Sequence, residues 1–157
     1  MDMAAQVATS QTNEAKRGEE ARKQSEQAVS QVTQLEAQSR EAYRRQEYQQ
    51  ATDLMRQADQ LRAELAQKAK DADVQAAQEA MQQGDWMQAQ AHWFAAVAAA
   101  PMQPDYHFNL AVTLDRLGET ILAARQYAEA LQLAETAGAR FDRTAARRRL
   151  AEIGEQP

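Results

Sequence analysis

The sequence predicts an all-α protein built of stacked helical hairpins, and three observations lead to this prediction. Alanine, glutamine, glutamate and arginine fill most of the 157 positions, with only five glycines and three prolines. The four common residue types favour helix because they lose little side-chain freedom there. No run of β-branched or aromatic residues alternates with polar ones, as a strand would require. Lastly, the chain repeats itself with a period of about 34 residues, which is typical of helical arrays.

The repeat is clearest between two stretches that each place an acidic residue after a glycine. MQQGDWMQAQAHWFAAV (81–97) aligns with DRLGETILAARQYAEAL (115–131), so that Gly84 falls on Gly118 and Trp93 on Tyr127. A fainter copy, YRRQEYQQATDLMRQAD (43–59), precedes both and has Gln46 in place of the glycine. The interval from Gln46 to Gly84 is four positions longer than that from Gly84 to Gly118. This excess predicts an insertion around 66–69 that lengthens the intervening helix by about one turn.

Each unit of this length predicts a helical hairpin. In the second unit, residues 74–83 form the first helix, Gly84 and Asp85 the turn, and residues 86–100 a return helix that stops before Pro101. Glycine supplies the positive φ that such a turn requires. Trp93 is expected to fill the space between this hairpin and its neighbour. Both tryptophans are therefore predicted to have a structural role first.

The pattern resembles the tetratricopeptide repeat (TPR) family of bacterial type, whose repeating unit has small residues at its eighth, twentieth and twenty-seventh positions. The matching residues are Ser39, Ala51, Ala58, Ala77, Ala89, Ala96, Ala111, Ala123 and Ala130. The family's turn glycine matches Gly84 and Gly118, and its large residue at position twenty-four matches Met55, Trp93 and Tyr127.

The sequence departs from that family at two places in the unit. The early tryptophan is replaced by Leu35, Asp73 and His107, and the terminal proline, present as Pro101, is missing from the first and third units. The resemblance covers residues 32–137 and implies a TPR-like superhelix of about three repeats, at 32–65 (degenerate), 70–103 and 104–137.

Residues 138–157 are predicted to form a capping helix and a tail. Asp142 is the expected N-cap. Ala146, Leu150 and Ile153 lie on one helical face, while Arg147 and Arg148 point outward. Repeat arrays need such a cap with one polar face.

Residues 1–31 are predicted to form a helical or partly disordered extension, frayed over about residues 1–18. It begins a heptad pattern of mostly small residues: Ala21, Ser25, Ala28, Val32, Leu35, Ser39 and Ala42. Such a seam is weak coiled-coil material. The segment is expected either to lie along the repeats or a second chain, or to be a solvated tether to a membrane anchor.

Charge and composition restrict the classes of function. The net charge of −5 argues against bulk attraction to nucleic acid or anionic lipid. Without cysteine the chain has no disulfides and no thiolate chemistry. The longest apolar run is far shorter than the ~20 residues of a membrane span, and the start lacks a signal-peptide pattern. We expect a soluble chain of the cytoplasm or periplasm, or a part excised from a larger or membrane-anchored protein.

No pattern in the sequence predicts catalysis. His92 and His107 fall in different hairpins without an acidic or histidine partner at i+4, so they are predicted to pack rather than to bind metal. A phosphate loop and a nucleophile elbow are both missing. The expectation is therefore a non-enzyme without metal, cofactor or small-molecule substrate.

The family resemblance implies a concave groove lined by the first helix of each repeat, which holds a protein or peptide partner. The corresponding residues are Arg40, Tyr43, Arg44, Val74, Gln75, Gln78, Met81, Gln82, Phe108, Asn109, Val112, Asp115 and Arg116. Family members that clamp the carboxylate of heat-shock chaperones use a set of lysines, arginines and asparagines, of which only Asn109 is present. Phe108, Met81 and Tyr43 are expected to be exposed apolar anchors.

The predicted function is thus that of an adaptor or assembly factor. A looser resemblance to bacterial repeat proteins points to pilus, secretion-system or envelope assembly. One alternative is a scaffold that forms homo-oligomers through the N-terminal helix. A weaker alternative is nucleic-acid binding through the C-terminal arginines, namely Arg140, Arg143, Arg147, Arg148 and Arg149.

Overall fold

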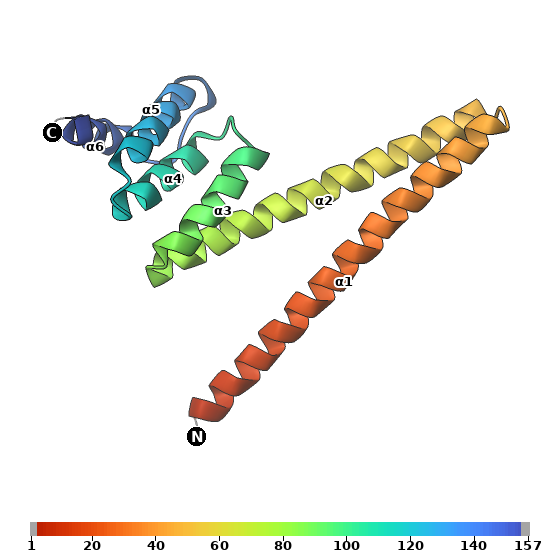
Figure 1. Cartoon of the computed structure of the whole chain (residues 1–157), viewed down its shortest axis with the longest axis horizontal. Helices are drawn as coiled ribbons and strands as arrows, with labels where there is room; N and C mark the ends of the chain where they lie inside the picture. The colour runs from red at the N-terminus through yellow and green to blue at the C-terminus, as the bar shows by residue number, and fades with distance from the viewer. Residues whose placement is uncertain (1–2, 155–157) are drawn as a thin grey trace. The chain divides into compact units, whose positions relative to one another are not determined.

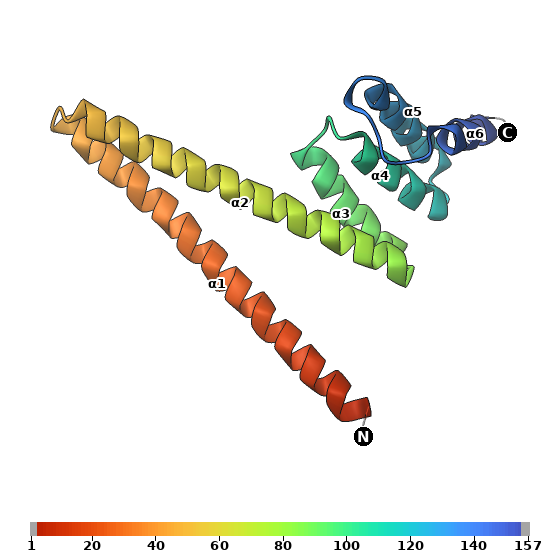
Figure 2. The ribbon, with the colours of Figure 1, turned by 180° about the vertical axis from the view of Figure 1, so that it is seen from behind.

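The computed structural model describes the backbone of residues 3–154, and the side chains of residue 9 and residues 11–154. Over this part the chain forms helices and no strand, so the all-α prediction is confirmed (Figures 1 and 2). The outermost residues of the predicted regions 1–31 and 138–157 lie outside the described residues. The helices are α1 (Met3–Arg44), α2 (Tyr48–Gln83), α3 (Trp86–Ala99), α4 (Pro104–Arg116), α5 (Thr120–Ala137) and α6 (Arg143–Gly154).

The chain divides into two compact units, with the boundary between Gln67 and Lys68. Unit 1 consists of α1 and the first part of α2, and unit 2 consists of the rest of α2 with α3 to α6. The helix predicted over 74–83 is therefore only the last part of a 36-residue helix. Its continuity has a simple cause, because residues 48–83 include neither glycine nor proline to interrupt it.

The turns of the three hairpins have the same hydrogen bonds in the same register. In the second hairpin, Gly84 N donates to Met81 O and Asp85 N donates to Ala80 O. The same two bonds recur in the third hairpin, from Gly118 and Glu119, and in the first, from Gln46 and Glu47. The turn residue has positive φ in each case, 74° at Gly84, 78° at Gly118 and 66° at Gln46. Gln46 thus adopts the left-handed conformation that glycine adopts in the other two turns.

Small residues bring the two helices of each hairpin together. All nine small positions of the repeat are buried, from Ser39 to Ala130. Trp93 has no exposed surface, its Nε1 donates to Met81 Sδ at 3.1 Å, and its ring lies 5.9 Å from that of Tyr106 on α4. Its predicted place in the core is confirmed. Trp86 is only half-buried, with the guanidinium of Arg116 5.5 Å from its ring centroid.

The closing helix has the predicted cap. Asp142 Oδ1 accepts hydrogen bonds from the backbone of Thr144 and Ala145, at 2.8 and 3.1 Å. Ala146 and Ile153 are buried and Leu150 is half-buried, while Arg147 and Arg148 are exposed. Helix α6 therefore covers the end of the stack with its apolar face.

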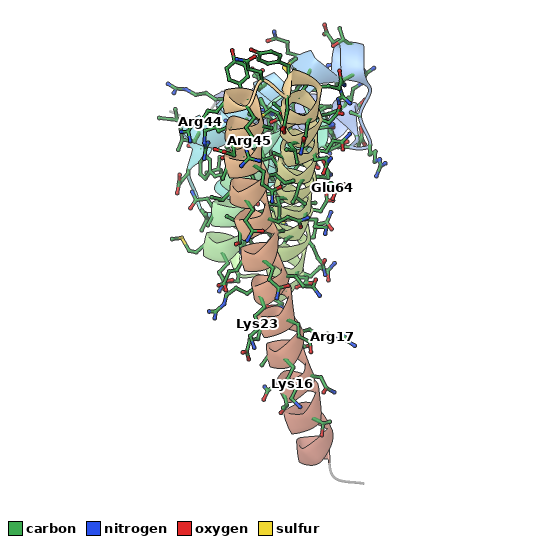
Figure 3. All side chains as sticks on the ribbon, turned by 90° about the vertical axis from the view of Figure 1, so that its right-hand side faces the viewer. Lys16, Arg17, Lys23, Arg44, Arg45 and Glu64 are labelled. Carbon is green, nitrogen blue, oxygen red and sulfur yellow. The ribbon has the colours of Figure 1, made fainter. Side chains whose placement is uncertain are left out.

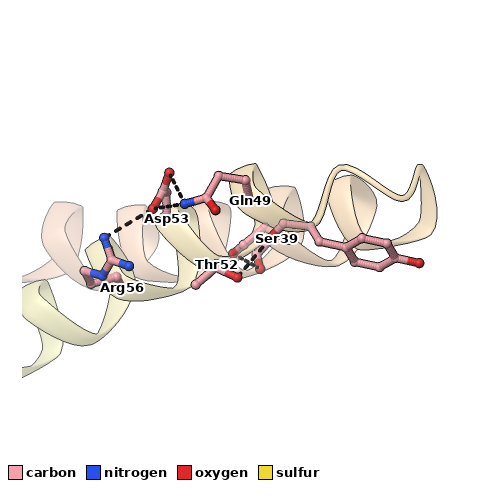
Figure 4. Close-up of polar contacts among 7 residues, drawn as sticks. Ser39, Gln49, Thr52, Asp53 and Arg56 are labelled. Atoms are coloured by element: carbon pink, nitrogen blue, oxygen red, sulfur yellow. Dashed lines mark hydrogen bonds and ion pairs between the residues drawn. The ribbon is translucent and has the colours of Figure 1, made fainter.

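Unit 1 is a hairpin of two long helices. Ser39 Oγ donates to Ala51 O at 2.8 Å across the hairpin (Figure 4), and Arg62 pairs with Glu36. Most heptad residues of α1 are used inside this hairpin, where Val32, Ser39 and Ala42 are buried; the earlier two, Ala21 and Ser25, are exposed.

The described part of α1 is helical from Met3 onward, and the fraying expected up to residue 18 stays a prediction. Its first half exposes charged side chains such as Lys16, Arg17 and Lys23 (Figure 3). Ion pairs one turn apart support this stretch, with Lys23 Nζ 2.7 Å from Glu19 Oε1 and Arg22 Nε 3.4 Å from Glu26 Oε1.

The shared turn predicts opposite effects for two substitutions. Gly118→Ala should destabilise the protein by about 1 kcal/mol, because alanine is disfavoured at positive φ although its Cβ would meet no atom within 4 Å. Gln46→Gly should stabilise unit 1 by about 0.5 kcal/mol, since relief of the left-handed conformation exceeds the added freedom of the unfolded chain. Urea unfolding followed by circular dichroism measures both. Equal effects of the same sign would contradict a common turn.

Candidate functional site

The predicted groove residues fall in both units of the structure. Arg40, Tyr43 and Arg44 belong to unit 1, and the other ten belong to unit 2.

Unit 2 contains a cleft of about 800 Å³. It is bounded by α2, by the beginning of α4 and by the connection between α5 and α6. Its lining residues are Val74, Gln78, Trp93, Gln103, Asp105, Tyr106, Phe108, Asn109, Ala137, Gly138, Ala139, Arg140 and Phe141. Of the predicted groove residues, Val74, Gln78, Phe108 and Asn109 are among them.

The remaining predicted residues of unit 2 do not line this cleft. On α2, Gln75 donates to Glu79 Oε1 at 2.9 Å, and Gln82 is exposed. On α4, Val112 packs against the core and Arg116 lies over the Trp86 ring. The predicted groove residues that line the cleft therefore belong to the N-terminal part of α4 and to one face of α2.

Two of the three predicted anchors are only partly exposed. Phe108 is half-buried, with its ring stacked on Phe141 at a centroid distance of 4.4 Å and edge-on to Tyr127 at 5.9 Å. Met81 is half-buried and accepts the hydrogen bond of Trp93. The expectation that both side chains are exposed was wrong for two reasons. Phe141, in the connection after α5, covers one side of the Phe108 ring, and Met81 packs against the core beside Trp93. Tyr43 is 65% exposed, as predicted.

The connection between α5 and α6 supplies the part of the cleft that sequence reasoning missed. It leaves α5 at Gly138, which has a φ of 74°, and its Arg140 N donates to Asp105 Oδ1 at 2.9 Å. Phe141 then stacks on Phe108. The one sequence feature that could have indicated this contact is Phe141, a large aromatic residue directly before the N-cap Asp142 of the closing helix.

The polar side chains of the cleft are available for a ligand. Among the described residues, the amides of Gln78, Gln103 and Asn109 make no hydrogen bond within the chain, and the guanidinium of Arg140 has no ion-pair partner. An amide side chain both donates and accepts hydrogen bonds. The cleft therefore offers uncommitted donors and acceptors beside the aromatic surface of Tyr106, Phe108 and Phe141.

Asp115, another predicted groove residue, is already paired within the chain. Arg149 of α6 donates to both of its carboxylate oxygens, Nε to Oδ2 at 2.6 Å and an Nη to Oδ1 at 2.7 Å. This charged hydrogen bond lowers the pKa of the Asp115 carboxyl below its ordinary value, although burial acts in the opposite direction. Burial, followed by the nearby Asp115 carboxylate, raises the pKa of Tyr127 to about 12. The cluster ties α6 to α4 and α5.

The C-terminal arginines differ in how far they are engaged. Arg149 binds Asp115 and Glu152, and Arg143 donates to Ala134 O at 3.3 Å. Among the described side chains this leaves the guanidinium groups of Arg140, Arg147 and Arg148 with neither an ion pair nor a hydrogen bond. A nucleic-acid surface would thus have three of the five predicted arginines available.

Both histidines make contacts within unit 2. His92 Nδ1 lies 3.0 Å from Asp73 Oδ1. The ring of His107 is buried, with Nδ1 2.7 Å from Gln126 Oε1 and Nε2 2.8 Å from Pro101 O. Within the described residues, no three side chains of His, Asp or Glu gather as a metal site would require.

The predicted residues of unit 1 line a shallow surface near the turn of its hairpin. Arg40, Tyr43 and Arg44 form a hollow of about 320 Å³ with Ser39 and Met55. A second hollow, of about 410 Å³, shares three of these residues and adds Tyr48, Ala51 and Thr52. All three predicted residues are exposed.

Comparison with protein-family models finds no match to the chain, and comparison with curated proteins finds no similar sequence. None of the described helices combines the length and the apolar character that crossing a membrane requires.

The Asp115–Arg149 pair predicts an acid-dependent contribution to stability. Asp115→Asn should lower the free energy of unfolding by about 1–2 kcal/mol at pH 7, because Arg149 loses a charged hydrogen-bond acceptor. The folded-state pKa of Asp115 lies below its ordinary value of 3.8, so this stabilisation is present above about pH 4 and lost as the pH falls through the folded-state pKa. Urea unfolding at a series of pH values measures it. Glu129→Gln, at an exposed position of α5, is the control; a cost that persists at low pH would contradict the assignment.

Tyr127 predicts a loss of stability at alkaline pH. Its folded-state pKa is raised from 10.0 to about 12, so its contribution is complete below pH 10 and is lost as the pH rises through 12. Between pH 10 and 12 the free energy of unfolding of the wild type should fall by up to about 2–3 kcal/mol relative to that of Tyr127→Phe. Unfolding of both proteins at matched alkaline pH measures the difference. Parallel curves would show that Tyr127 ionises equally easily in the folded and unfolded chains.

Proposed function

We propose that the chain is a non-catalytic protein–protein interaction module, and that the cleft of unit 2 binds an extended segment of a protein partner. Within this proposal unit 2 is a TPR-like array of two hairpins closed by α6, and unit 1 is a degenerate hairpin of the same kind. The identical turn hydrogen bonds at Gln46, Gly84 and Gly118 support this assignment, as do the nine buried small residues.

The observation that carries the proposal is the combination of free amides and aromatic rings in one cleft. An extended peptide has backbone N–H and C=O groups that no neighbouring strand satisfies. Gln78, Gln103 and Asn109 can pair with such groups in either direction. The rings of Tyr106, Phe108 and Phe141 provide apolar surface for one or two side chains of the segment. Affinity would come from hydrogen bonds to the peptide backbone, and selectivity from contacts of the peptide side chains with these three rings.

The chemistry of the cleft also indicates which segments should bind. The carboxylate of Asp105 accepts a backbone hydrogen bond from Arg140, whereas the Arg140 guanidinium is uncommitted. Asp105 and Arg140 thus give the lining one charge of each sign, and the Arg140 guanidinium is the charged group left without an ion-pair partner among the described side chains. It can pair with a carboxylate beside the apolar anchor of a bound segment. A role as an adaptor in the assembly of a bacterial pilus, secretion system or envelope complex is the broader form of this proposal.

A selection of random peptides displayed on phage, with the immobilised full chain as bait, tests the proposal. Enriched peptides should share an apolar residue near an acidic one. Their affinity for the Gln78→Ala/Asn109→Ala/Arg140→Ala variant, measured by fluorescence anisotropy, should be at least about tenfold weaker than for wild type. None of these side chains contributes to the core, so the variant should keep its helical content.

The matched control changes three exposed polar residues outside the cleft, Gln88→Ala/Arg125→Ala/Gln132→Ala. It should bind the selected peptides as wild type does. Peptides that bind both variants equally well would place the binding surface elsewhere, and a selection that enriches no peptide above background would argue against a peptide-binding function.

A further inference from the structure

One position of the repeat is buried in the second and third hairpins but partly exposed to solvent in the first. The large residue at this position is Trp93 in the second hairpin and Tyr127 in the third, with exposures of 0% and 4%. Its counterpart in unit 1 is Met55, which is 39% exposed. Because the turns of the three hairpins are in the same register, these side chains occupy equivalent places on their helices.

The helix that follows each hairpin of unit 2 provides the cover. Trp93 packs against Tyr106 of α4, and Tyr127 belongs to the same core cluster as Ala146 and Ile153 of α6. Unit 1 contains no further helix after its hairpin, because α2 continues past Gln67 without a break. The equivalent face of unit 1 is left without this cover.

The uncovered face has the composition of an interface centre. Tyr43 and Tyr48 are 65% and 56% exposed, and their rings meet edge-on at a centroid distance of 5.3 Å. The two hollows described above share Ser39, Tyr43 and Met55, so they form one continuous surface. Tyrosine, methionine and arginine are enriched at the centres of protein interfaces. We call this surface the Met55 face.

Charge is divided between the two ends of the Met55 face. Near the turn the face is lined by Arg40 and Arg44. Arg44 lies 3.5 Å from the Glu41 carboxylate, which also pairs with Arg45 at 3.0 Å, and Arg40 has no ion-pair partner among the described side chains. This end is basic. One helical turn further from the hairpin turn, Glu36 lies four residues before Arg40 and Asp59 four residues after Met55, so each shares a helix face with a residue of the Met55 face. Arg62 pairs with both of these carboxylates. That end is acidic.

We propose that two copies of the chain associate through their Met55 faces about a twofold axis close to Met55. A twofold interface brings the same surface of both copies together, so each patch must be complementary to itself. In an antiparallel arrangement the basic end of one copy lies opposite the acidic cluster of the other. The helices of the second hairpin then cover Met55, as α4 covers Trp93 and α6 covers Tyr127.

This dimer differs from an oligomer formed through the heptad residues of α1, and it is independent of peptide binding in the cleft of unit 2. It does not use the exposed heptad residues Ala21 and Ser25 of α1. Of the heptad residues, only the buried Ser39 lines the Met55 face. It uses none of the residues that line the cleft of unit 2, so the proposal stands whether or not that cleft binds peptides.

Sedimentation velocity of the full chain, from about 1 µM to about 1 mM, tests the proposal. Wild type should pass from monomer to dimer with rising concentration, and added salt should weaken the dimer because exposed charges are screened. Tyr43→Glu should raise the dimer dissociation constant roughly tenfold or more, as it places a charge at the centre of the apolar patch twice. Met87→Glu, at an exposed methionine of unit 2, is the control and should leave it unchanged.

A charge exchange tests the antiparallel arrangement itself. Arg40→Glu and Asp59→Arg should each weaken the dimer, whereas the double variant should restore it to within roughly threefold of wild type, because opposite charges again face each other. Both side chains are exposed, and circular dichroism verifies that the hairpin stays folded. A protein that remains monomeric throughout the concentration range overturns the proposal. So does a dimer that survives Tyr43→Glu, or whose single charge variants are not rescued by the double variant.

Discussion

The structure depends on the close approach of two helices at positions that only small side chains can occupy. Ser39, Ala51 and Ala58 provide this approach in the first hairpin, and alanines provide it in the other two. A larger residue at any of these positions would separate the helices and displace the residues between hairpins. The left-handed turn is part of the same constraint, because it brings the second helix back at the right distance. The large residue between hairpins, such as Trp93, then has a defined space to fill.

Most of the architecture could be predicted because its determinants are local and periodic. The turns at Gly84 and Gly118, the small residues and the cap at Asp142 are each defined by a few neighbouring residues. Even Gln46 was placed correctly from spacing alone, and its positive φ of 66° agrees with that place. The continuity of α2 was harder to predict. The insertion near 66–69 was expected to lengthen the intervening helix by about one turn, but not to leave a single helix running from the first turn to the second.

The candidate site was harder to predict than the helices, because it depends on contacts between residues far apart in the sequence. Phe141 stacks on Phe108, and Arg149 of the closing helix binds Asp115 of α4. Helical periodicity shows which face of a helix a residue occupies, but not which connection folds over that face. The predicted anchors at Phe108 and Met81 were therefore assigned to the right helices with the wrong exposure.

The positions of the two tryptophans allow the two units to be followed separately by spectroscopy. Both lie in unit 2, where Trp93 is buried beside a sulfur atom and Trp86 is half-buried beside a guanidinium. Unit 1 has tyrosines but no tryptophan. Intrinsic fluorescence excited at the red edge of the absorption band thus reports on unit 2 alone, whereas far-ultraviolet dichroism reports on the helices of both units. Recording the two signals in one unfolding experiment reveals, without any label, whether the units melt as one cooperative body or in separate steps.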